Sequence, residues 1–175
     1  MRRPLRIIGI LVVVLVVAFF ALRTFTKSNS PEAVAEVRQN GVSIRVDYCR
    51  PYKKGRVIFG GLVPYEKVWR TGANEATLIH LDQDVTIVGK PLKAGTYSLW
   101  SIPYKGGWVM VFNGETGQWG TQYDSSKDVL RVLVTNRKRN PPLEQFTIDF
   151  QPQAGGADMR LAWDDTEAVV PFRNQ

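Results

Sequence analysis

The chain opens with one long apolar run and then changes to short stretches in which apolar and polar residues alternate. From Ile7 to Leu22 no charged residue interrupts the run. Residues 5–22 are long enough to cross the hydrocarbon core of a bilayer, about 30 Å thick, as a helix. The pattern therefore predicts one N-terminal transmembrane helix, followed by a domain of a different kind.

The charges that flank the run predict its orientation. Three arginines and the terminal amine precede it, and only two basic residues follow it before the first acidic ones. An excess of Lys and Arg marks the cytoplasmic side, so we expect a single-pass protein of the cell membrane with a cytoplasmic N-terminus and an extracytoplasmic domain. A cleaved signal peptide would need small residues after the run. The sequence there is AFFALRTF, which favours an uncleaved anchor.

The composition divides the chain into three parts. Residues 1–27 form the expected cytoplasmic stub and anchor, and residues 28–40 are rich in Ser, Asn, Pro, Glu and Gln, as linkers often are. Within this linker, PEAVAEV suits a short helix, with Ser30 as its N-cap and Pro31 at its first position. Residues 41–175 form the expected folded domain.

Alternation from Val42 onward predicts β-strands. In VSIRVDY (42–48) the apolar residues lie on one face and the polar residues on the other, as in a half-buried strand. Further strands are expected at 76–81, 85–89, 95–102, 108–112, 128–136, 145–150, 159–163 and 167–172. Turn residues predict hairpins between 76–81 and 85–89 and between 95–102 and 108–112. Pro171 suits a strand end or an edge strand.

Eight or nine closely spaced strands without a convincing helix predict an all-β domain. An antiparallel β-sandwich or a jelly-roll-like barrel fits this pattern. The single cysteine, Cys49, excludes an intramolecular disulfide. The domain of 135 residues at 41–175 must therefore be held together by one hydrophobic core.

Net charge argues against a nucleic-acid partner. The chain carries 23 basic and 16 acidic residues, a net charge of +7. Residues 1–27 hold five of the basic residues and none of the acidic ones, which leaves 18 and 16 for residues 28–175. Nucleic-acid binding needs a concentrated basic patch. The one cluster, at 137–139, precedes Asn140-Pro141-Pro142, and we interpret it as a solvated turn.

Candidate catalytic groups are few. A nucleophilic hydrolase would have to use His80, the one histidine, which lies in the strand 76–81. Cys49 could meet it across neighbouring strands, although a packed strand histidine is the favoured interpretation. Scattered carboxylates could hold Ca²⁺, but no zinc-type cluster is present, and no metal or cofactor is predicted. Glu66 and Glu75 could serve as the carboxylate pair of a hydrolase.

The stretch GLVPYEKVWRTGANEAT (61–77) has almost no hydrophobic periodicity. Gly72 and Asn74 predict a tight turn with Arg70 and Glu75 projecting from either side of it. In one interpretation these two side chains form a partly buried ion pair that braces a structural corner. In the other, the stretch points polar side chains into a ligand pocket. The candidate ligand-binding residues are Arg70, Thr71, Asn74 and Glu75.

Trp119 is a further candidate ligand-binding residue. It lies in GETGQWGTQY (114–123), a loop without periodicity. An exposed indole there could stack on the face of a sugar ring, with Tyr123 nearby. Alternatively, Trp119 folds back and covers the end of the sandwich.

Several long stretches of the domain are distinctive. They are VDYCRPYKKGRVIFGG (46–61), GLVPYEKVWRTGANEAT (61–77), KAGTYSLWSIP (93–103), WVMVFN (108–113), QWG (118–120) and KDVLRVLV (127–134). Together they resemble the signature of the bacterial family called Domain of Unknown Function 2911, over most of residues 40–172. The resemblance implies a bacterial, often exported protein without an established activity. The family usually has Ser at the position of Cys49, which argues against an essential thiol here.

These observations together favour a binding role over an enzymatic one. The expected ligand is a glycan, a component of the cell envelope or another polar molecule, held near the loops 65–75 and 113–123. The alternatives are a carboxylate-dependent hydrolase and a structural partner in an envelope complex, which would use an edge strand for contact.

Overall fold

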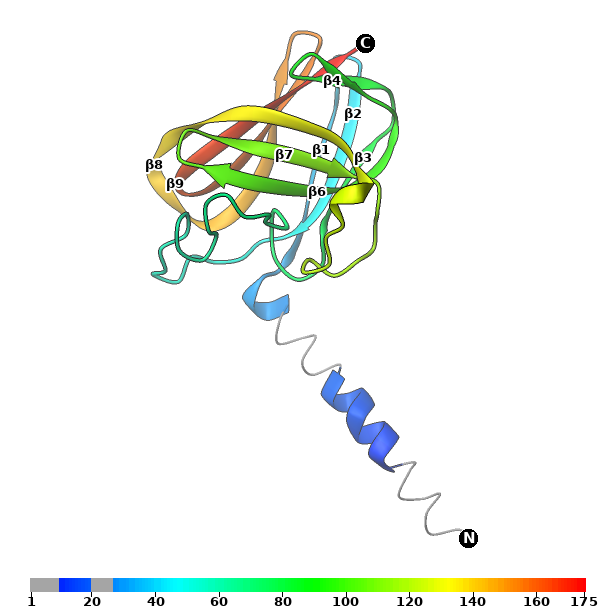
Figure 1. Cartoon of the computed structure of the whole chain (residues 1–175), viewed down its shortest axis with the longest axis vertical. Coiled ribbons are helices and arrows are strands. Elements are labelled where there is room, and N and C mark those ends of the chain that lie inside the picture. The colour runs from blue at the N-terminus through cyan, green and yellow to red at the C-terminus, as the bar shows by residue number, and fades with distance from the viewer. Residues whose placement is uncertain (1–9, 20–26) are drawn as a thin grey trace.

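The computed structural model describes residues 10–19 and 27–175 (Figure 1). The predicted transmembrane span, residues 5–22, lies partly outside the described residues. Residues 10–19 are helical, and their large apolar side chains are exposed. Within the two described ranges, no helix is both long enough and apolar enough to span a membrane.

Residues 27–175 are mostly β-structure, as the alternation predicts. The elements are β1 (Glu32–Gln39), β2 (Val42–Cys49), β3 (Thr77–Leu81), β4 (Val85–Ile87), β5 (Lys90–Leu92), β6 (Gly95–Tyr104), β7 (Gly107–Asn113), the 3-10 helix η1 (Ser125–Lys127), β8 (Asp128–Gln153) and β9 (Gly156–Asn174). The strands form one antiparallel sheet in the order β1-β2-β3-β6-β7-β8-β9-β4-β5. The all-β prediction is therefore confirmed at the level of fold class.

The two longest strands curl this sheet around a core (Figure 1). The first part of β8 pairs with β7, and from Asn136 onward β8 pairs with β9. In turn, β9 leaves β8 after Ala168 and pairs with β4 from Phe172. Pro171 lies at this change of partner, where its missing N–H costs no ladder hydrogen bond.

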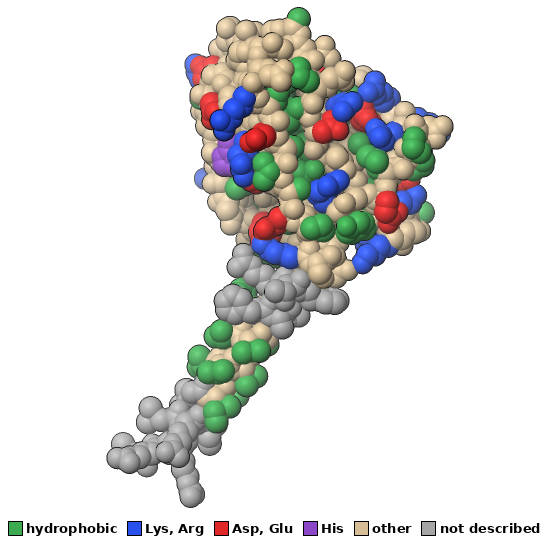
Figure 2. Space-filling model, turned by 180° about the vertical axis from the view of Figure 1, so that it is seen from behind, with side chains coloured by type: hydrophobic (Ala, Val, Ile, Leu, Met, Phe, Trp, Pro, Cys, Tyr) green, Lys and Arg blue, Asp and Glu red, His purple; other side chains and the backbone are tan. Residues whose placement is uncertain are grey.

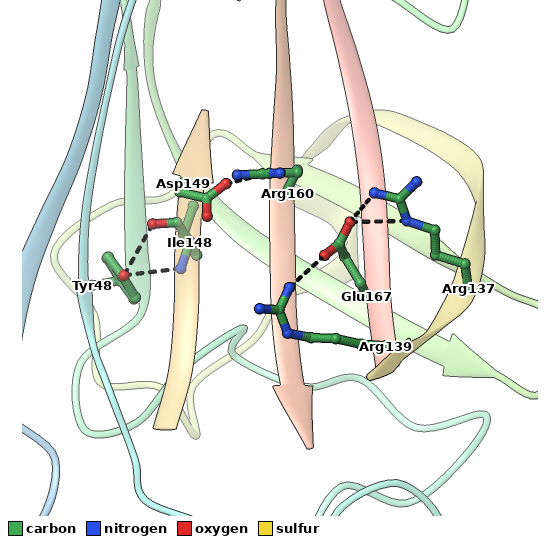
Figure 3. A network of polar contacts seen from close by, with 7 residues as sticks. All are labelled: Tyr48, Arg137, Arg139, Ile148, Asp149, Arg160 and Glu167. Carbon is green, nitrogen blue, oxygen red and sulfur yellow. Dashed lines mark hydrogen bonds and ion pairs between the residues drawn. The ribbon is translucent and has the colours of Figure 1, made fainter. Parts of the chain in front are cut away.

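Curling brings β2 against β8 and encloses one hydrophobic core. The hydroxyl of Tyr48 on β2 donates to the carbonyl of Ile148 on β8 and accepts from its N–H (Figure 3). All core residues of the main cluster lie between Ala33 and Phe172, and residues 10–19 contribute none. Among the described residues, the core draws nothing from the helix at 10–19, and we therefore expect residues 27–175 to fold on their own.

The hairpin predictions have mixed outcomes. The hairpin β6–β7 is confirmed, and only Lys105 and Gly106 join its strands. The predicted hairpin between 76–81 and 85–89 is wrong, since β3 pairs with β2 and β6 while β4 pairs with β5 and β9. Alternation identifies a strand, but the choice of partner depends on the apolar faces that other strands offer.

Two local predictions are wrong. Most of PEAVAEV is not helical but belongs to β1, which pairs with β2 along its whole length and buries Ala35 and Val37. Burial and pairing outweigh the helix propensity of Ala and Glu here. The expected turn at 137–139 lies inside β8. Irregular register between Lys138 and Thr147 lets the long strand bend without ending.

Candidate functional site

The stretch 70–75 forms a strained corner. Thr71 and Asn74 both have left-handed backbones, with φ of 53° and 60°. This conformation is unusual for a β-branched residue such as Thr71. The buried Thr71 hydroxyl lies 3.1 Å from that of Ser101, and its carbonyl accepts from the Thr77 hydroxyl at 2.8 Å. Thr71 therefore holds the corner in place, and it lines neither of the two clefts described below.

The corner separates two clefts. The Arg70 cleft, about 340 Å³ in volume, is lined by Arg70 together with two further basic residues and two indoles. The Glu75 cleft, about 680 Å³, is lined by Glu75, Glu32 and Asp47 among others. No ion pair joins Arg70 to Glu75 in the described part of the chain, so the predicted brace is wrong. The left-handed turn between them sends the two side chains to opposite sides.

Arg70 is half-buried and lacks a polar partner. Within residues 10–19 and 27–175, its guanidinium makes no hydrogen bond or ion pair with another residue. Burial lowers the pKa of Arg70 because it removes the charged guanidinium from water. A desolvated positive charge is normally compensated by a carboxylate or by carbonyl groups. Arg70 is therefore available to an anion from outside the domain.

Other arginines of the domain show the compensated arrangement (Figure 3). Arg137 and Arg139 both bond the buried carboxylate of Glu167, Arg137 through Nε at 3.0 Å and Arg139 through a terminal nitrogen at 3.2 Å. Arg160 donates from Nε to Asp149 at 2.6 Å. These ion pairs stabilise the fold. Arg70 differs from these arginines because its guanidinium has no carboxylate partner among the described residues.

The rest of the Arg70 cleft is also cationic. Lys54 and Arg56 line it, and their side chains bond only neutral groups. The Lys54 ammonium donates to the side-chain oxygen of Asn29 at 2.6 Å. The Arg56 guanidinium donates to the carbonyls of Tyr52 and Lys53. Nearby, Glu144 accepts from the backbone N–H of Lys54 and not from its ammonium. No carboxylate lines the cleft in the described structure.

The second predicted loop lies directly against the corner. The N–H of Gly120 donates to the carbonyl of Asn74 at 3.0 Å, and the backbones of Glu75 and Trp119 form a β-bridge. Gly120 packs so closely on Arg70 that a Cβ there would lie 2.4 Å from Arg70 Cδ. The loops 65–75 and 113–123 are thus brought together, although the sequence places them far apart.

Trp119 lies on the outside of this junction. Its side chain is 44 % exposed, and it lines neither cleft. Tyr123 packs on the buried ring of Trp100 instead, with ring centroids 5.0 Å apart. The Tyr123 ring therefore packs on the domain through Trp100. The exposed indole itself is still available for contact.

Cys49 and His80 are not brought together. Cys49 Sγ lies 3.8 Å from Glu75 Oε2, and burial raises the pKa of the thiol, which disfavours a reactive thiolate. His80 lies between Asp47 and Thr96, with ring nitrogens 3.3 Å and 2.9 Å from their oxygens. Neither His80 nor Thr96 lines one of the clefts described above. This arrangement gives no support to a nucleophilic hydrolase.

The carboxylate pair is not assembled either. Glu66 is exposed on its own turn and does not line the cleft that holds Glu75. Among the described residues, no group of three or more His, Cys, Asp or Glu side chains is arranged to hold a metal ion.

Sequence reasoning missed four charged or aromatic lining residues of the Arg70 cleft. Lys54 and Arg56 belong to a loop without periodicity, and Trp69 precedes Arg70 in the corner. Trp163 follows the apolar alternation of β9, and this pattern predicts a core residue. Trp163 is buried, and it nevertheless lines the cleft. No local pattern signals that these four side chains converge, because they come from separate parts of the chain.

The fold and this cleft define an antiparallel β-domain with a cationic, aromatic-walled pocket beside a strained corner. A protein-family model described as "Protein of unknown function (DUF2911)" matches residues 30–172. The match covers most of the chain, and the chain therefore belongs to the DUF2911 family. No curated protein and no solved structure matches the chain.

Proposed function

We propose that this protein binds a small anionic ligand in the Arg70 cleft. We further propose that residues 5–22 anchor it in the cell membrane, with the domain outside the cytoplasm. The observation that carries the binding role is the half-buried, unpartnered guanidinium of Arg70. The curled sheet around one core supports a sandwich-like interpretation of the domain.

The chemistry of the cleft favours an anion. Arg70, Lys54 and Arg56 place three positive charges around one cavity. The side chains of Lys54 and Arg56 bond only neutral groups, so their charges are not neutralised. A guanidinium presents a planar fork of N–H groups that matches a carboxylate or a phosphate in two-point contact. The ligand would therefore carry one of these groups.

Two indoles supply the apolar wall that most ligand pockets need. Trp69 and Trp163 line the cleft and lie stacked, with ring centroids 6.0 Å apart and planes 21° apart. A molecule with an acidic head and a flat or apolar body suits this combination. Acidic sugars, anionic metabolites and phosphate-bearing envelope components all belong to this class. A neutral glycan would instead depend on the exposed Trp119.

A calorimetric binding screen on the full-length protein in detergent tests the proposal. The probes are inorganic phosphate, glycerol phosphate, galacturonate and, as the neutral counterpart, galactose. We expect binding of at least one anion, its loss in Arg70→Ala and its retention in Trp119→Ala. Arg160→Ala is the matched control, because it removes an arginine that already has a carboxylate partner.

The result that overturns the proposal is equally specific. If galactose binds and Trp119→Ala abolishes that binding while Arg70→Ala does not, the ligand site is the exposed indole. If no probe binds and Arg70→Ala lowers the melting temperature strongly, the cleft arginine is a structural group.

A further inference from the structure

A short segment beside the Arg70 cleft exposes apolar side chains among basic ones. Val57 is 72 % exposed, Leu62 46 % and Val68 39 %. Val57 and Leu62 are neighbours in space, since the N–H of Leu62 donates to the carbonyl of Val57 at 3.0 Å. Leu62 also lines the Arg70 cleft. The exposed apolar surface and the cationic cleft are therefore continuous.

The same segment concentrates the positive charge of the domain. Residues 53–70 contain five basic residues and one acidic residue, Glu66. The other residues of 28–175 contain 13 basic and 15 acidic residues. Residues 28–175 thus contain one strongly cationic segment, and the rest of this range is slightly acidic. Interspersed apolar and basic side chains are typical of surfaces that lie on anionic bilayers.

The position of the segment agrees with this chemistry. Asn29 and Ser30 line the same cleft as Leu62, and Asn29 accepts from the Lys54 ammonium. The segment therefore packs against the part of the chain that enters the domain from the N-terminal side (Figure 1). Figure 2 shows hydrophobic and charged side chains together at the end of the domain that carries the N-terminal helix. Six residues lie between Leu22 and Asn29, so the seven Cα–Cα steps from one to the other reach at most about 25 Å.

We propose that residues 53–70 form a docking surface for an anionic phospholipid bilayer. Val57 and Leu62 enter the headgroup region, the basic side chains contact lipid phosphates, and one phosphate headgroup occupies the Arg70 cleft. The inference rests on the proposed anion-binding function and adds the source of the anion. An anchored domain is held at a high local concentration near the membrane, so even a weak surface interaction would keep it docked.

Vesicle binding by residues 27–175, which hold the complete core, tests the docking surface. Sedimentation with vesicles of phosphatidylglycerol and phosphatidylcholine is compared with sedimentation with phosphatidylcholine alone. We expect binding to the anionic vesicles only, weakened by added salt. Each Lys or Arg near the surface contributes about a fivefold change in partitioning. Lys54→Gln with Lys67→Gln should therefore weaken binding about 25-fold.

Matched substitutions elsewhere separate docking from general charge and hydrophobicity. Leu62→Asp should weaken vesicle binding at least about tenfold, whereas Leu133→Asp, at an exposed leucine on β8, should leave it unchanged. Lys90→Gln with Lys105→Gln removes two basic side chains outside the segment and should have little effect. Thermal unfolding of each variant identifies any that does not fold.

Soluble glycerol phosphate, titrated into the same protein, distinguishes the two proposals. Vesicle binding that needs both Leu62 and the basic side chains supports the docking surface. If glycerol phosphate binds at Arg70 but the anionic vesicles do not, docking is refuted and the anion-binding function stands. If neither binds, docking is refuted, and the anion-binding function also fails when inorganic phosphate and galacturonate do not bind either. Vesicle binding that is lost equally in the control variants also refutes docking through this segment.

Discussion

The substitution Tyr48→Phe removes only one hydroxyl group, but it should destabilise the domain strongly. The hydroxyl is buried, and it bonds both the N–H and the carbonyl of Ile148, at 2.9 Å and 3.2 Å. These bonds tie β2 to β8 across the core (Figure 3). The ring itself, which packs edge-on against Phe146, is retained in the variant.

The expected loss follows from the groups left behind. Phenylalanine leaves the buried N–H and carbonyl of Ile148 without a partner, and each buried unsatisfied group costs about 1–3 kcal/mol. We expect the free energy of unfolding to fall by about 2–4 kcal/mol. For a domain of this size, the melting temperature should fall by roughly 6–12 °C.

Urea denaturation of residues 27–175, followed by circular dichroism, measures this loss. The midpoint should fall while the slope of the unfolding free energy with urea stays constant, because the buried surface is unchanged. Tyr104→Phe, at an exposed tyrosine, is the control. A loss below about 0.5 kcal/mol for Tyr48→Phe would show that water or a local shift satisfies Ile148, contrary to our reasoning.

The same variant has a predicted signature in its pH dependence. Burial raises the pKa of Tyr48, so the folded protein keeps its phenolic proton at a pH where the unfolded chain loses it. The native protein should therefore lose stability as the pH rises above about 10, the pKa of an unperturbed tyrosine. Part of that loss should be absent in Tyr48→Phe. An equal alkaline loss in both proteins would contradict the predicted change in pKa.

Three further changes test other parts of the structure. Glu167→Gln removes the negative charge that two arginines share, and it should lower the free energy of unfolding by about 1.5–3 kcal/mol, measured by urea denaturation. An unchanged free energy would mean that solvent already screens this cluster. Gly120→Ala places a Cβ 2.6 Å from the carbonyl oxygen of Asn74 and should lower the free energy of unfolding by about 1–3 kcal/mol. Gly114→Ala should leave it nearly unchanged, because there is space for a Cβ at that position. Burial raises the pKa of Tyr123 to about 12, so an alkaline absorbance titration should lose a step near pH 12 in Tyr123→Phe.

Most strands could be predicted from the sequence because their signal is local. The stretch VSIRVDY alternates strictly, and β2 buries Val42, Ile44 and Val46 as that alternation requires. The hairpin β6–β7 was equally accessible, since a short glycine-containing loop joins two apolar strands. Such patterns depend on residues two positions apart, which the chain itself supplies.

The wrong predictions concern choices that distant residues decide. Glu32–Gln39 has residues that favour a helix, but β2 offers it a complete pairing partner. The segment 137–139 precedes two prolines and resembles a turn, but pairing with β9 continues on both sides of them. Pairing with a remote strand outweighs local preference because it satisfies many backbone groups at once.

By itself, the sequence determined the β-rich class of the domain, the position of most strands and the two loops that meet at the candidate site. Only the tertiary structure decided how the side chains of those loops are partnered. The left-handed turn at Thr71 places Arg70 and Glu75 in separate clefts, and Lys54 and Trp163 reach Arg70 from remote segments. The type of a residue and the pattern of its neighbours can be read directly from the sequence. The charges that compensate it, and the cleft that it faces, depend on contacts between segments that only folding brings together.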